Sequence, residues 1–413
     1  MVGLTAQAAL RDRRLIYATS TARAFAFGLI SVVLGLYLAE LGFSSVRVGL
    51  LLTATLVGAS ALTFIVSLFG DRFGRRRSLA VFTLMIGLGS LAYALFPRYP
   101  VLLITGLLGA ISATGKDRGN FSVVEQAMLP QTATDAERTG LYARYNLIST
   151  LGSAAGALAA GVPVLLQRWL HMEVLPSYKA IFLFQSAVAV LLANAYWWLT
   201  PAVEAPGRAN GGRLVLPKAR SAKIVAGLSA LFALDSFGGG LVVQSFLAYW
   251  LKVQFGFSAA TVGVAFFLGG LLGALSFPVA AWLARRIGLV NTMVFTHLPS
   301  NLFFAAIALA PWGWLALAFY FCREALGSMD VPTRQSYIMA VVSPEERTAA
   351  AGFTTLSRQA AQSVSPSLAG WMVQAVGAGS PFFLAGGVKI LYDLGLWLSF
   401  RRIKPPEEVR TSP

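Results

Sequence analysis

This chain of 413 residues has little cysteine, little histidine and little charge. Its single cysteine, Cys322, excludes an internal disulfide, and its two histidines, His171 and His297, are too far apart in sequence to indicate a metal site. We expect packed or solvated roles for both histidines, and no resident metal or cofactor. Charged residues make up 12% of the chain, against roughly 25% in soluble domains, which excludes an ordinary soluble protein.

The motifs of common enzyme classes are also missing. No Gly-x-x-x-x-Gly-Lys-Ser/Thr segment is present to cradle the phosphates of ATP. Neither His-Glu-x-x-His nor Gly-x-Ser-x-Gly occurs, which removes the usual signatures of zinc peptidases and α/β-hydrolases. The chain is therefore not expected to be an enzyme, and ATP is not expected to be its energy source.

Long hydrophobic runs take the place of charge. Hydrophobic residues make up 56% of the chain, and its mean hydropathy is +0.68. A run of about 20 apolar residues can cross a bilayer, where every backbone polar group needs a partner, so each run is predicted to be a helix. Twelve such runs occupy residues 15–40, 46–69, 78–96, 101–128, 136–166, 178–200, 222–251, 258–284, 289–309, 312–341, 345–376 and 381–400.

The chain repeats itself. Residues 41–49, Leu-Gly-Phe-Ser-Ser-Val-Arg-Val-Gly, return at residues 255–263 as Phe-Gly-Phe-Ser-Ala-Ala-Thr-Val-Gly. A Pro- and Gly-rich stretch that begins at Pro201 separates six spans from the next six, so both halves enter the membrane from the same side. We predict four parts: an N-terminal six-helix bundle at 1–200, a cytoplasmic linker at 201–221, a C-terminal six-helix bundle at 222–402 and a cytoplasmic tail at 403–413.

The surplus of basic residues indicates the orientation in the membrane. The chain has 33 Lys and Arg against 17 Asp and Glu, a formal net charge of +16. If the first residues lie in the cytoplasm, most Lys and Arg of the loops fall on that side, as the positive-inside rule requires. The charge is then a topology signal and an attraction to anionic lipid headgroups, not a nucleic-acid-binding surface. We predict a multi-pass protein of the inner (plasma) membrane with both termini in the cytoplasm.

A basic loop between the second and third spans has a specific pattern. Residues 70–77 are Gly-Asp-Arg-Phe-Gly-Arg-Arg-Arg. In this position the pattern resembles the cytoplasmic signature of the major facilitator superfamily. The resemblance implies an all-α membrane fold of twelve helices in two pseudo-symmetric six-helix bundles, and a gate that stabilises the outward-facing state. The gating residues would be Gly70, Asp71, Arg72, Gly74, Arg75 and Arg76.

The chemistry of this loop suits a gate. Asp71 can accept hydrogen bonds from helix N-terminal amides, and Arg75 or Arg76 can pair with an acid. The corresponding segment of the second half has Arg285 in place of the aspartate. The second copy is therefore expected to lack the acidic part of the gate.

Several charged residues fall inside the predicted spans, where they are costly unless they are solvated or paired. By the resemblance, spans one, four, seven and ten line a central cavity, and both halves of this chain carry charges of both signs there. Alternatively, these charges form salt bridges that hold the bundles together. The candidate substrate-binding residues are Arg23, Lys116, Asp117, Arg118, Arg144, Asn146, Asp235, Gln244, Arg323, Glu324, Arg358 and Gln362.

One pair of these residues suggests how protons would couple to transport. Arg23 in span one aligns with Asp235 in span seven at a shift of 212 positions. An incoming anion could take the arginine and leave the aspartate free to bind a proton. The candidate proton-coupling acids are Asp235, Asp117, Glu324 and Asp330.

Two other sets of span charges have local interpretations. Lys389 and Asp393 are four residues apart in span twelve, so they are expected to pair with each other. Glu125 and Arg334 occupy equivalent places near the cytoplasmic ends of spans four and ten. A gate or edge pair is expected for them, not substrate contact.

These patterns favour a secondary active transporter that moves a small solute by alternating access and couples to protons. Because bases outnumber acids among the cavity candidates, we expect an anionic or zwitterionic solute. The alternatives are a proton-coupled multidrug exporter of amphipathic compounds and, in another class, a transport-inactive membrane sensor or scaffold. The expected partners are the small-molecule substrate, protons and membrane lipids, without nucleic acid, and the resemblance implies a monomer.

Overall fold

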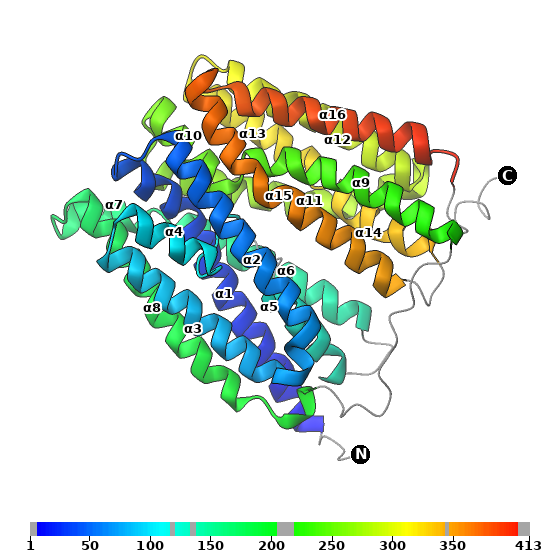
Figure 1. Cartoon of the computed structure of the whole chain (residues 1–413), viewed down its shortest axis with the longest axis horizontal. Coiled ribbons are helices and arrows are strands. Elements are labelled where there is room, and N and C mark those ends of the chain that lie inside the picture. The colour runs from blue at the N-terminus through cyan, green and yellow to red at the C-terminus, as the bar shows by residue number, and fades with distance from the viewer. Residues whose placement is uncertain (1–5, 116–119, 133–137, 205–218, 343–346, 404–413) are drawn as a thin grey trace. The chain divides into compact units, whose positions relative to one another are not determined.

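The computed structural model in Figure 1 describes residues 6–115, 120–132, 138–204, 219–342 and 347–403. In these residues the secondary structure is helical, with no β-strand. The α-helices are α1 (Ala6–Glu40), α2 (Ser45–Phe73), α3 (Arg75–Leu95), α4 (Tyr99–Leu107), α5 (Asn120–Met128), α6 (Arg138–Ala159), α7 (Val162–Trp169), α8 (Val174–Ala195), α9 (Ala219–Leu241), α10 (Gln244–Phe255), α11 (Ala259–Ile287), α12 (Leu289–Ala306), α13 (Gly313–Gly327), α14 (Asp330–Val341), α15 (Arg347–Ala375) and α16 (Ser380–Phe400). Short 3-10 turns are η1 (Leu129–Thr132), η3 (Tyr196–Trp198), η4 (Pro201–Val203) and η5 (Ile307–Leu309).

The helices coincide with the predicted hydrophobic runs, and the all-α membrane fold is confirmed. Nine helical stretches in the described part of the chain are long and apolar enough to cross a membrane. Four of the predicted runs differ from the expectation of one unbroken helix. Each of these holds two helices: α4 and α5, α6 and α7, α9 and α10, and α13 and α14.

The interruption between α4 and α5 has a clear physical basis. Gly109 and Gly115 adopt left-handed φ angles of 65° and 64°, which glycine tolerates without steric cost. The carbonyl of Ala113 accepts a hydrogen bond from Ser245 N at 3.1 Å, and the carbonyl of Gly115 accepts one from Ser153 Oγ at 2.5 Å. Non-helical backbone is tolerated in a membrane-spanning segment where other parts of the protein satisfy its polar groups, as they do for these two carbonyls.

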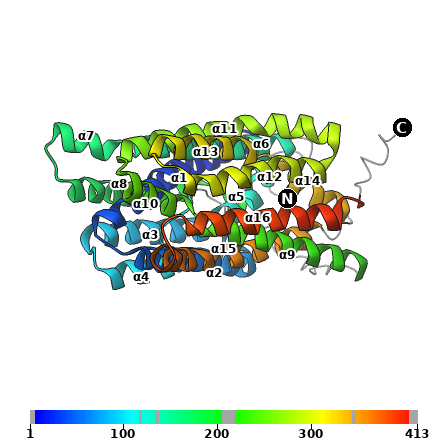
Figure 2. The same ribbon diagram turned by 90° about the horizontal axis from the view of Figure 1, so that it is seen from above.

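The chain divides into two compact units, of which the first comprises Met1–Gly211 and Val243–Phe267. In this unit α1 packs against α6, α8 and α10, and α3 lies along α8, as Figures 1 and 2 show. Glycine allows the closest approach: a Cβ atom at Gly156 of α6 would lie 1.9 Å from the carbonyl oxygen of Phe25 on α1. Small residues at helix contacts are the usual device for close packing in membranes.

The second unit comprises Gly212–Val242 and Leu268–Pro413. Here α9 packs against α15 and α16, and α12 packs against α13, α14 and α16. Its buried core includes Phe232, Tyr337 and Tyr392. These helices surround the polar site described below.

The internal repeat is visible in the backbone. Gly42 follows α1 with φ of 70°, and Gly256 follows α10 with φ of 67°, so both helices end in the same left-handed turn. Gly74 and Gly288, which precede α3 and α12, have φ angles of 98° and 86°. The two halves therefore use glycine at equivalent turns, although the surrounding side chains differ.

Candidate functional site

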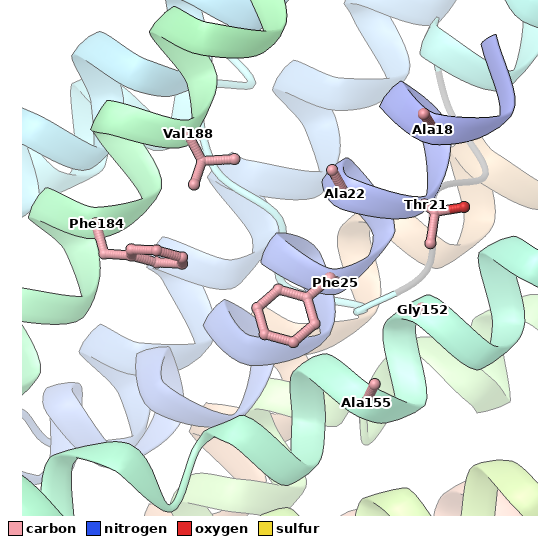
Figure 3. A pocket seen from close by; sticks show the side chains of 8 residues that line it. All are labelled: Ala18, Thr21, Ala22, Phe25, Gly152, Ala155, Phe184 and Val188. Atoms are coloured by element: carbon pink, nitrogen blue, oxygen red, sulfur yellow. The ribbon is translucent and has the colours of Figure 1, made fainter. Parts of the chain in front are cut away.

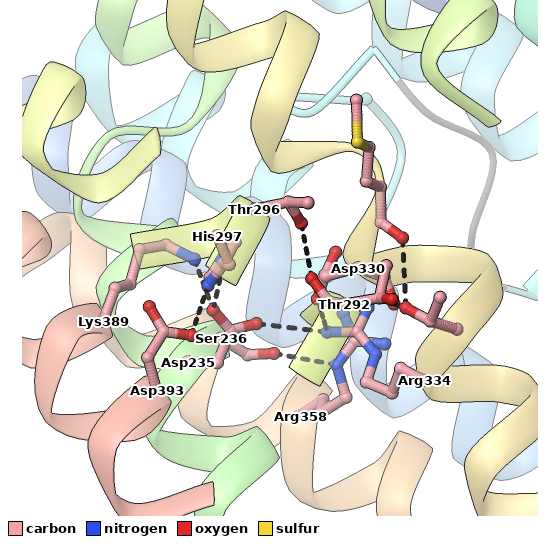
Figure 4. Close-up of polar contacts among 12 residues, drawn as sticks. Asp235, Ser236, Thr292, Thr296, His297, Asp330, Arg334, Arg358, Lys389 and Asp393 are labelled. Atoms are coloured by element: carbon pink, nitrogen blue, oxygen red, sulfur yellow. Dashed lines mark hydrogen bonds and ion pairs between the residues drawn. The ribbon is translucent and has the colours of Figure 1, made fainter. Parts of the chain in front are cut away.

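The second unit contains a group of ionisable side chains buried among α9, α12, α14, α15 and α16 (Figure 4). We call it the ionic cluster. All of its members except the half-buried Arg358 are less than a tenth exposed. Its members are Asp235, His297, Asp330, Arg334, Arg358, Lys389 and Asp393.

Asp235 of α9 is shared by several cationic groups. Its Oδ1 accepts a hydrogen bond from Lys389 Nζ on α16, and its Oδ2 lies 3.4 Å from Arg334 Nη1 on α14. The Nε2 atom of His297 on α12 lies 3.8 Å from the same Oδ1. Because the side chain is buried, these neighbours supply the stabilisation that water would otherwise give to a carboxylate.

Asp393 of α16 has different partners. Its Oδ1 lies 2.9 Å from His297 Nδ1, and its Oδ2 accepts a hydrogen bond of 2.8 Å from Asn301 Nδ2. The local pair that we predicted between Lys389 and Asp393 is therefore wrong, because Lys389 extends to Asp235 of another helix. A contact between helices replaces one within a helix.

The two arginines extend the cluster in different ways. Arg334 donates from Nη1 to Asp330 Oδ2 at 2.7 Å, a pair one helical turn apart on α14. Arg358 of α15 donates from Nε to Ser236 Oγ at 3.0 Å, next to Asp235 in sequence. Since Arg358 is only half-buried, the cluster reaches from the unit's interior to a more exposed position.

The first unit holds a separate buried ion pair. Arg23 of α1 donates to Glu125 of α5 through two hydrogen bonds, Nη1 to Oε1 at 2.9 Å and Nη2 to Oε2 at 2.6 Å. Tyr196 Oη lies 2.6 Å from Arg23 Nη1, and Tyr145 Oη donates to Glu125 Oε2 at 2.8 Å. The guanidinium also lies over the ring of Phe121, 4.4 Å from its centroid. The polar atoms of this pair are thus satisfied within the unit.

The gating loop meets an acid from the end of the first bundle. Arg75 N and Arg76 N, at the start of α3, donate to the two oxygens of Glu204 at 2.6 and 3.3 Å, and Arg76 Nε donates to Glu204 Oε1 at 3.0 Å. A carboxylate at a helix N-terminus is favourably placed for the helix dipole. Glu204 is therefore the acid that pairs with Arg76. Asp71, Arg72 and the surroundings of Gly70 lie outside what the structure describes of the side chains.

Other predicted site residues lie apart from these groups. Arg323 and Glu324 of α13 pair with each other, and the Arg323 guanidinium lies 4.3 Å from the centroid of the Phe304 ring. Gln244 begins α10 in the first unit, where its Oε1 would lie 2.5 Å from a Cβ atom at Gly115. The Gln244 side chain thus lies against the interruption between α4 and α5.

The remaining predicted residues lie away from the ionic cluster or outside the described residues. Arg144 and Asn146 are exposed on α6, and Gln362 is half-buried on α15. The Lys-Asp-Arg sequence that we predicted in span four lies outside the described residues. Its members are Lys116, Asp117 and Arg118.

An apolar groove of about 570 Å³ lies on the first unit, between α1, α6 and α8 (Figure 3). The hydroxyl of Thr21 in its wall donates to the carbonyl of Tyr17 at 2.8 Å and so is already satisfied. The groove therefore suits hydrocarbon and offers an ionic solute little. Its lining residues are Ala18, Thr21, Ala22, Phe25, Gly152, Ala155, Phe184 and Val188.

Sequence reasoning missed His297 and Asn301 as site residues and missed Glu204 as the acid of the gating loop. A usable signal was present in span nine, where His297 and Asn301 are one helical turn apart in an otherwise apolar run. Their spacing places both on the helix face that meets α16. Glu204 carried no such signal, because it lies next to a Pro-rich linker.

Comparison with known proteins identifies relatives. The model of the Major Facilitator Superfamily matches residues 16–329. An uncharacterized membrane protein of Saccharomyces cerevisiae is 27% identical over 95% of this chain and 94% of its own length. NarK2 of Mycobacterium tuberculosis, a probable nitrate/nitrite transporter, is 26% identical over 76% of this chain and 77% of its own. The crystal structure of the nucleoside transporter NupG shares the fold, with a TM-score of 0.73 at 12% identity over 94% of this chain and 99% of that one.

Proposed function

The chain belongs to the major facilitator superfamily and is a multi-pass membrane transporter rather than an enzyme; on that premise we propose that it moves a small anionic or zwitterionic solute by proton-coupled alternating access. Two bundles would rock about a site near the midplane. Its partners would be the solute, protons and surrounding lipids, and the active form would be a monomer.

The observation that supports an anionic solute is the crowding of cationic groups on Asp235. Lys389 and Arg334 both contact this one carboxylate, and His297 faces it at 3.8 Å. An anionic group of the solute can take over one of these cations, because it offers the same charge and hydrogen-bond acceptors. Ionisable residues retained inside membrane-spanning helices are functional candidates by default, since burying them is costly.

The proton-coupling acids that we predicted are unequally available for this role. Asp330 is bonded to Arg334, and Glu324 is bonded to Arg323. Asp117 lies outside the described residues. Asp235 also contacts cations, and it links α9 to α16 through Lys389 and to α14 through Arg334.

The apolar groove favours a second candidate, a proton-coupled exporter of amphipathic compounds. Its lining in Figure 3 is hydrocarbon with one satisfied hydroxyl, which suits a drug-like molecule or a lipid chain. The ionic cluster would then bind only protons. A transport-inactive sensor or scaffold is the candidate of another class, and it predicts no flux at all.

We also propose an orientation of the chain and the membrane in which it lies. The excess of Lys and Arg in alternate loops supports cytoplasmic termini in an inner or plasma membrane. Impermeant maleimide labelling tests this in a Cys322→Ser background. A cysteine introduced at the exposed His171 is expected to react from outside in intact cells, and one at Thr411 only after lysis.

Flux in liposomes separates the candidate functions. The full-length chain is reconstituted, and uptake of nitrate, a monocarboxylate and a dipeptide is followed under an inside-alkaline pH gradient. Uptake of ethidium is followed under an inside-acidic gradient, because an exporter that exchanges drug for protons takes ethidium up as protons leave the lumen. We expect accumulation of an anion or of the dipeptide. Asp235→Asn is expected to abolish it, and the control Lys252→Gln, at a side chain about one-third exposed, is expected to retain it. Ethidium flux without anion or dipeptide flux supports the exporter, and no flux of any probe contradicts both transport proposals.

A further inference from the structure

Among the residues that the structure describes, the ionic cluster contains as many carboxylates as lysine and arginine side chains. Asp235, Asp330 and Asp393 face Lys389 and the two arginines, Arg334 and Arg358. With a neutral His297 the charges of this group balance. One added proton therefore leaves the buried cluster with a single positive charge.

The charged neighbours of this group on adjoining helices do not alter the balance. On α13, which packs against α12, Arg323 and Glu324 pair with each other. On α16, the Tyr392 ring lies edge-on to the His297 ring, with centroids 5.7 Å apart. Tyr337 of α14 donates to the carbonyl of Ile403. The proton content of the cluster thus turns on His297 and its acids.

Both ring nitrogens of His297 face a carboxylate. Nδ1 lies 2.9 Å from Asp393 Oδ1, and Nε2 lies 3.8 Å from Asp235 Oδ1. A neutral imidazole has one N–H, so one of its nitrogens presents a lone pair towards a carboxylate. A doubly protonated ring can instead donate from both nitrogens towards the two carboxylates.

Asp393 differs from the other acids of the cluster in its partners. Asp235 and Asp330 each contact a lysine or an arginine. Asp393 is bonded instead to His297 and Asn301, and within 4 Å of its carboxylate the described residues place no lysine or arginine. The charge of this pair can therefore change without breaking a bond to a lysine or an arginine.

We infer that the His297–Asp393 pair, rather than Asp235, binds the proton of the transport cycle, and that this proton balances one negative charge of the solute. The inference rests on the proposed function. The cluster is neutral when it holds neither proton nor anion, and neutral again when it holds both. The two intermediate states bury a net charge, which is costly in a bundle within the membrane. Obligatory coupling of one proton to one anionic charge follows.

The small number of histidines makes the proton site directly observable. The chain has two, so His171→Gln in an exposed loop leaves one imidazole. The detergent-purified full-length protein is labelled with ¹⁵N-histidine, and its ring nitrogens are followed by NMR from about pH 5 to about pH 9. We expect the ring to pass between its singly and doubly protonated forms in this range. We also expect Asp393→Asn to lower the doubly protonated fraction at pH 7.

A ring that keeps one protonation state throughout, or that titrates identically in Asp393→Asn, overturns the inference. The titration needs no substrate, so it decides this point even if no flux is found. In liposomes, His297→Gln is expected to lose pH-driven uptake of the transported anion but to retain exchange of that anion across the membrane. If wild-type flux is proton-driven and His297→Gln retains it, the proposed function is supported but the assignment of the proton to His297 and Asp393 is wrong. A thermal melt of each variant checks that it is folded.

Discussion

Arg23 and Glu125 form a two-armed ion pair inside the first unit, and the second unit repeats the pair with its charges exchanged. Asp235 aligns with Arg23 at a shift of 212 positions and Arg334 with Glu125 at a shift of 209, and these two residues lie 3.4 Å apart. Each pair joins the first helix of a half to its fourth span. The acid and the base have exchanged helices between the two halves. The contact is preserved because the attraction between opposite charges does not depend on which helix carries the positive one.

The first prediction concerns this buried pair. Both side chains are almost fully buried, at 3% and 0% exposure, so Glu125→Gln leaves the arginine charge without its counter-ion. Breaking such a pair costs about 3–5 kcal/mol, whereas replacing both partners by apolar residues is often neutral. We expect Glu125→Gln to lower the Tm of the detergent-purified protein strongly, and Arg23→Met with Glu125→Met to restore most of the loss.

A more exposed pair between α1 and α10 provides the control. Glu40 and Lys252 lie 4.0 Å apart and are about one-third exposed, so Glu40→Gln is expected to change stability by roughly 0–1 kcal/mol. Equal shifts of Tm for Glu40→Gln and Glu125→Gln would mean that burial of the Arg23 pair contributes nothing.

The fold could be predicted from the sequence because a segment that spans a membrane can adopt few backbone structures. The hydrophobic runs, the repeat at residues 41–49 and 255–263, and the signature at 70–77 all point to the same architecture, which the helices and the family match confirm. The interruption between α4 and α5 escaped prediction. It depends on side chains from other helices: the hydroxyls of Ser153 and Ser245 donate hydrogen bonds to free backbone carbonyls.

The site was less predictable for a related reason. Composition showed that charges lie in the spans, but the partner of each charge depends on helix rotation and packing, which the sequence pattern does not specify. The local rule for residues four apart predicted a pair of Lys389 with Asp393. Packing of α9 against α16 gave Lys389 a different acid and left Asp393 to a histidine on α12.

The second prediction concerns Asp235 and Lys389. Asp235→Asn removes the carboxylate that Lys389 and Arg334 share, so it leaves buried cations under-compensated. We expect a lower Tm as well as lost pH-driven flux. Adding Lys389→Met removes one of the stranded charges and is expected to recover part of the Tm but none of the flux. An unchanged Tm in Asp235→Asn would contradict the contacts seen in the cluster.

The third prediction concerns the contact of α1 with α6. A Cβ atom at Gly156 would lie 1.9 Å from the Phe25 carbonyl oxygen, far inside van der Waals contact. The two helices must separate to admit it, and overpacking of this kind costs about 1–3 kcal/mol or more. We expect Gly156→Ala to lower the Tm and the yield of folded protein.

Gly352 of α15 is the matched control, because nothing lies within 4 Å of its added Cβ atom. Alanine is the better helix former there, so Gly352→Ala is expected to leave the Tm unchanged or to raise it slightly. If both alanine variants melt alike, the close approach of α1 and α6 does not limit stability.

The last prediction concerns the gating loop and separates its two parts. Glu204 accepts hydrogen bonds from Arg75 N, Arg76 N and Arg76 Nε, so it anchors the start of α3 within the first unit. The ion pair between Arg76 and Glu204 is about one-quarter exposed, and Glu204→Gln is therefore expected to cost no more than about 1 kcal/mol of stability.

Asp71, in our proposal, acts instead on the outward-facing state through helix N-terminal amides. If Asp71 acts only on that state, Asp71→Asn should reduce flux in liposomes while leaving the Tm of the purified protein unchanged. Wild-type flux in Asp71→Asn, at equal amounts of reconstituted protein, would rule out this gate.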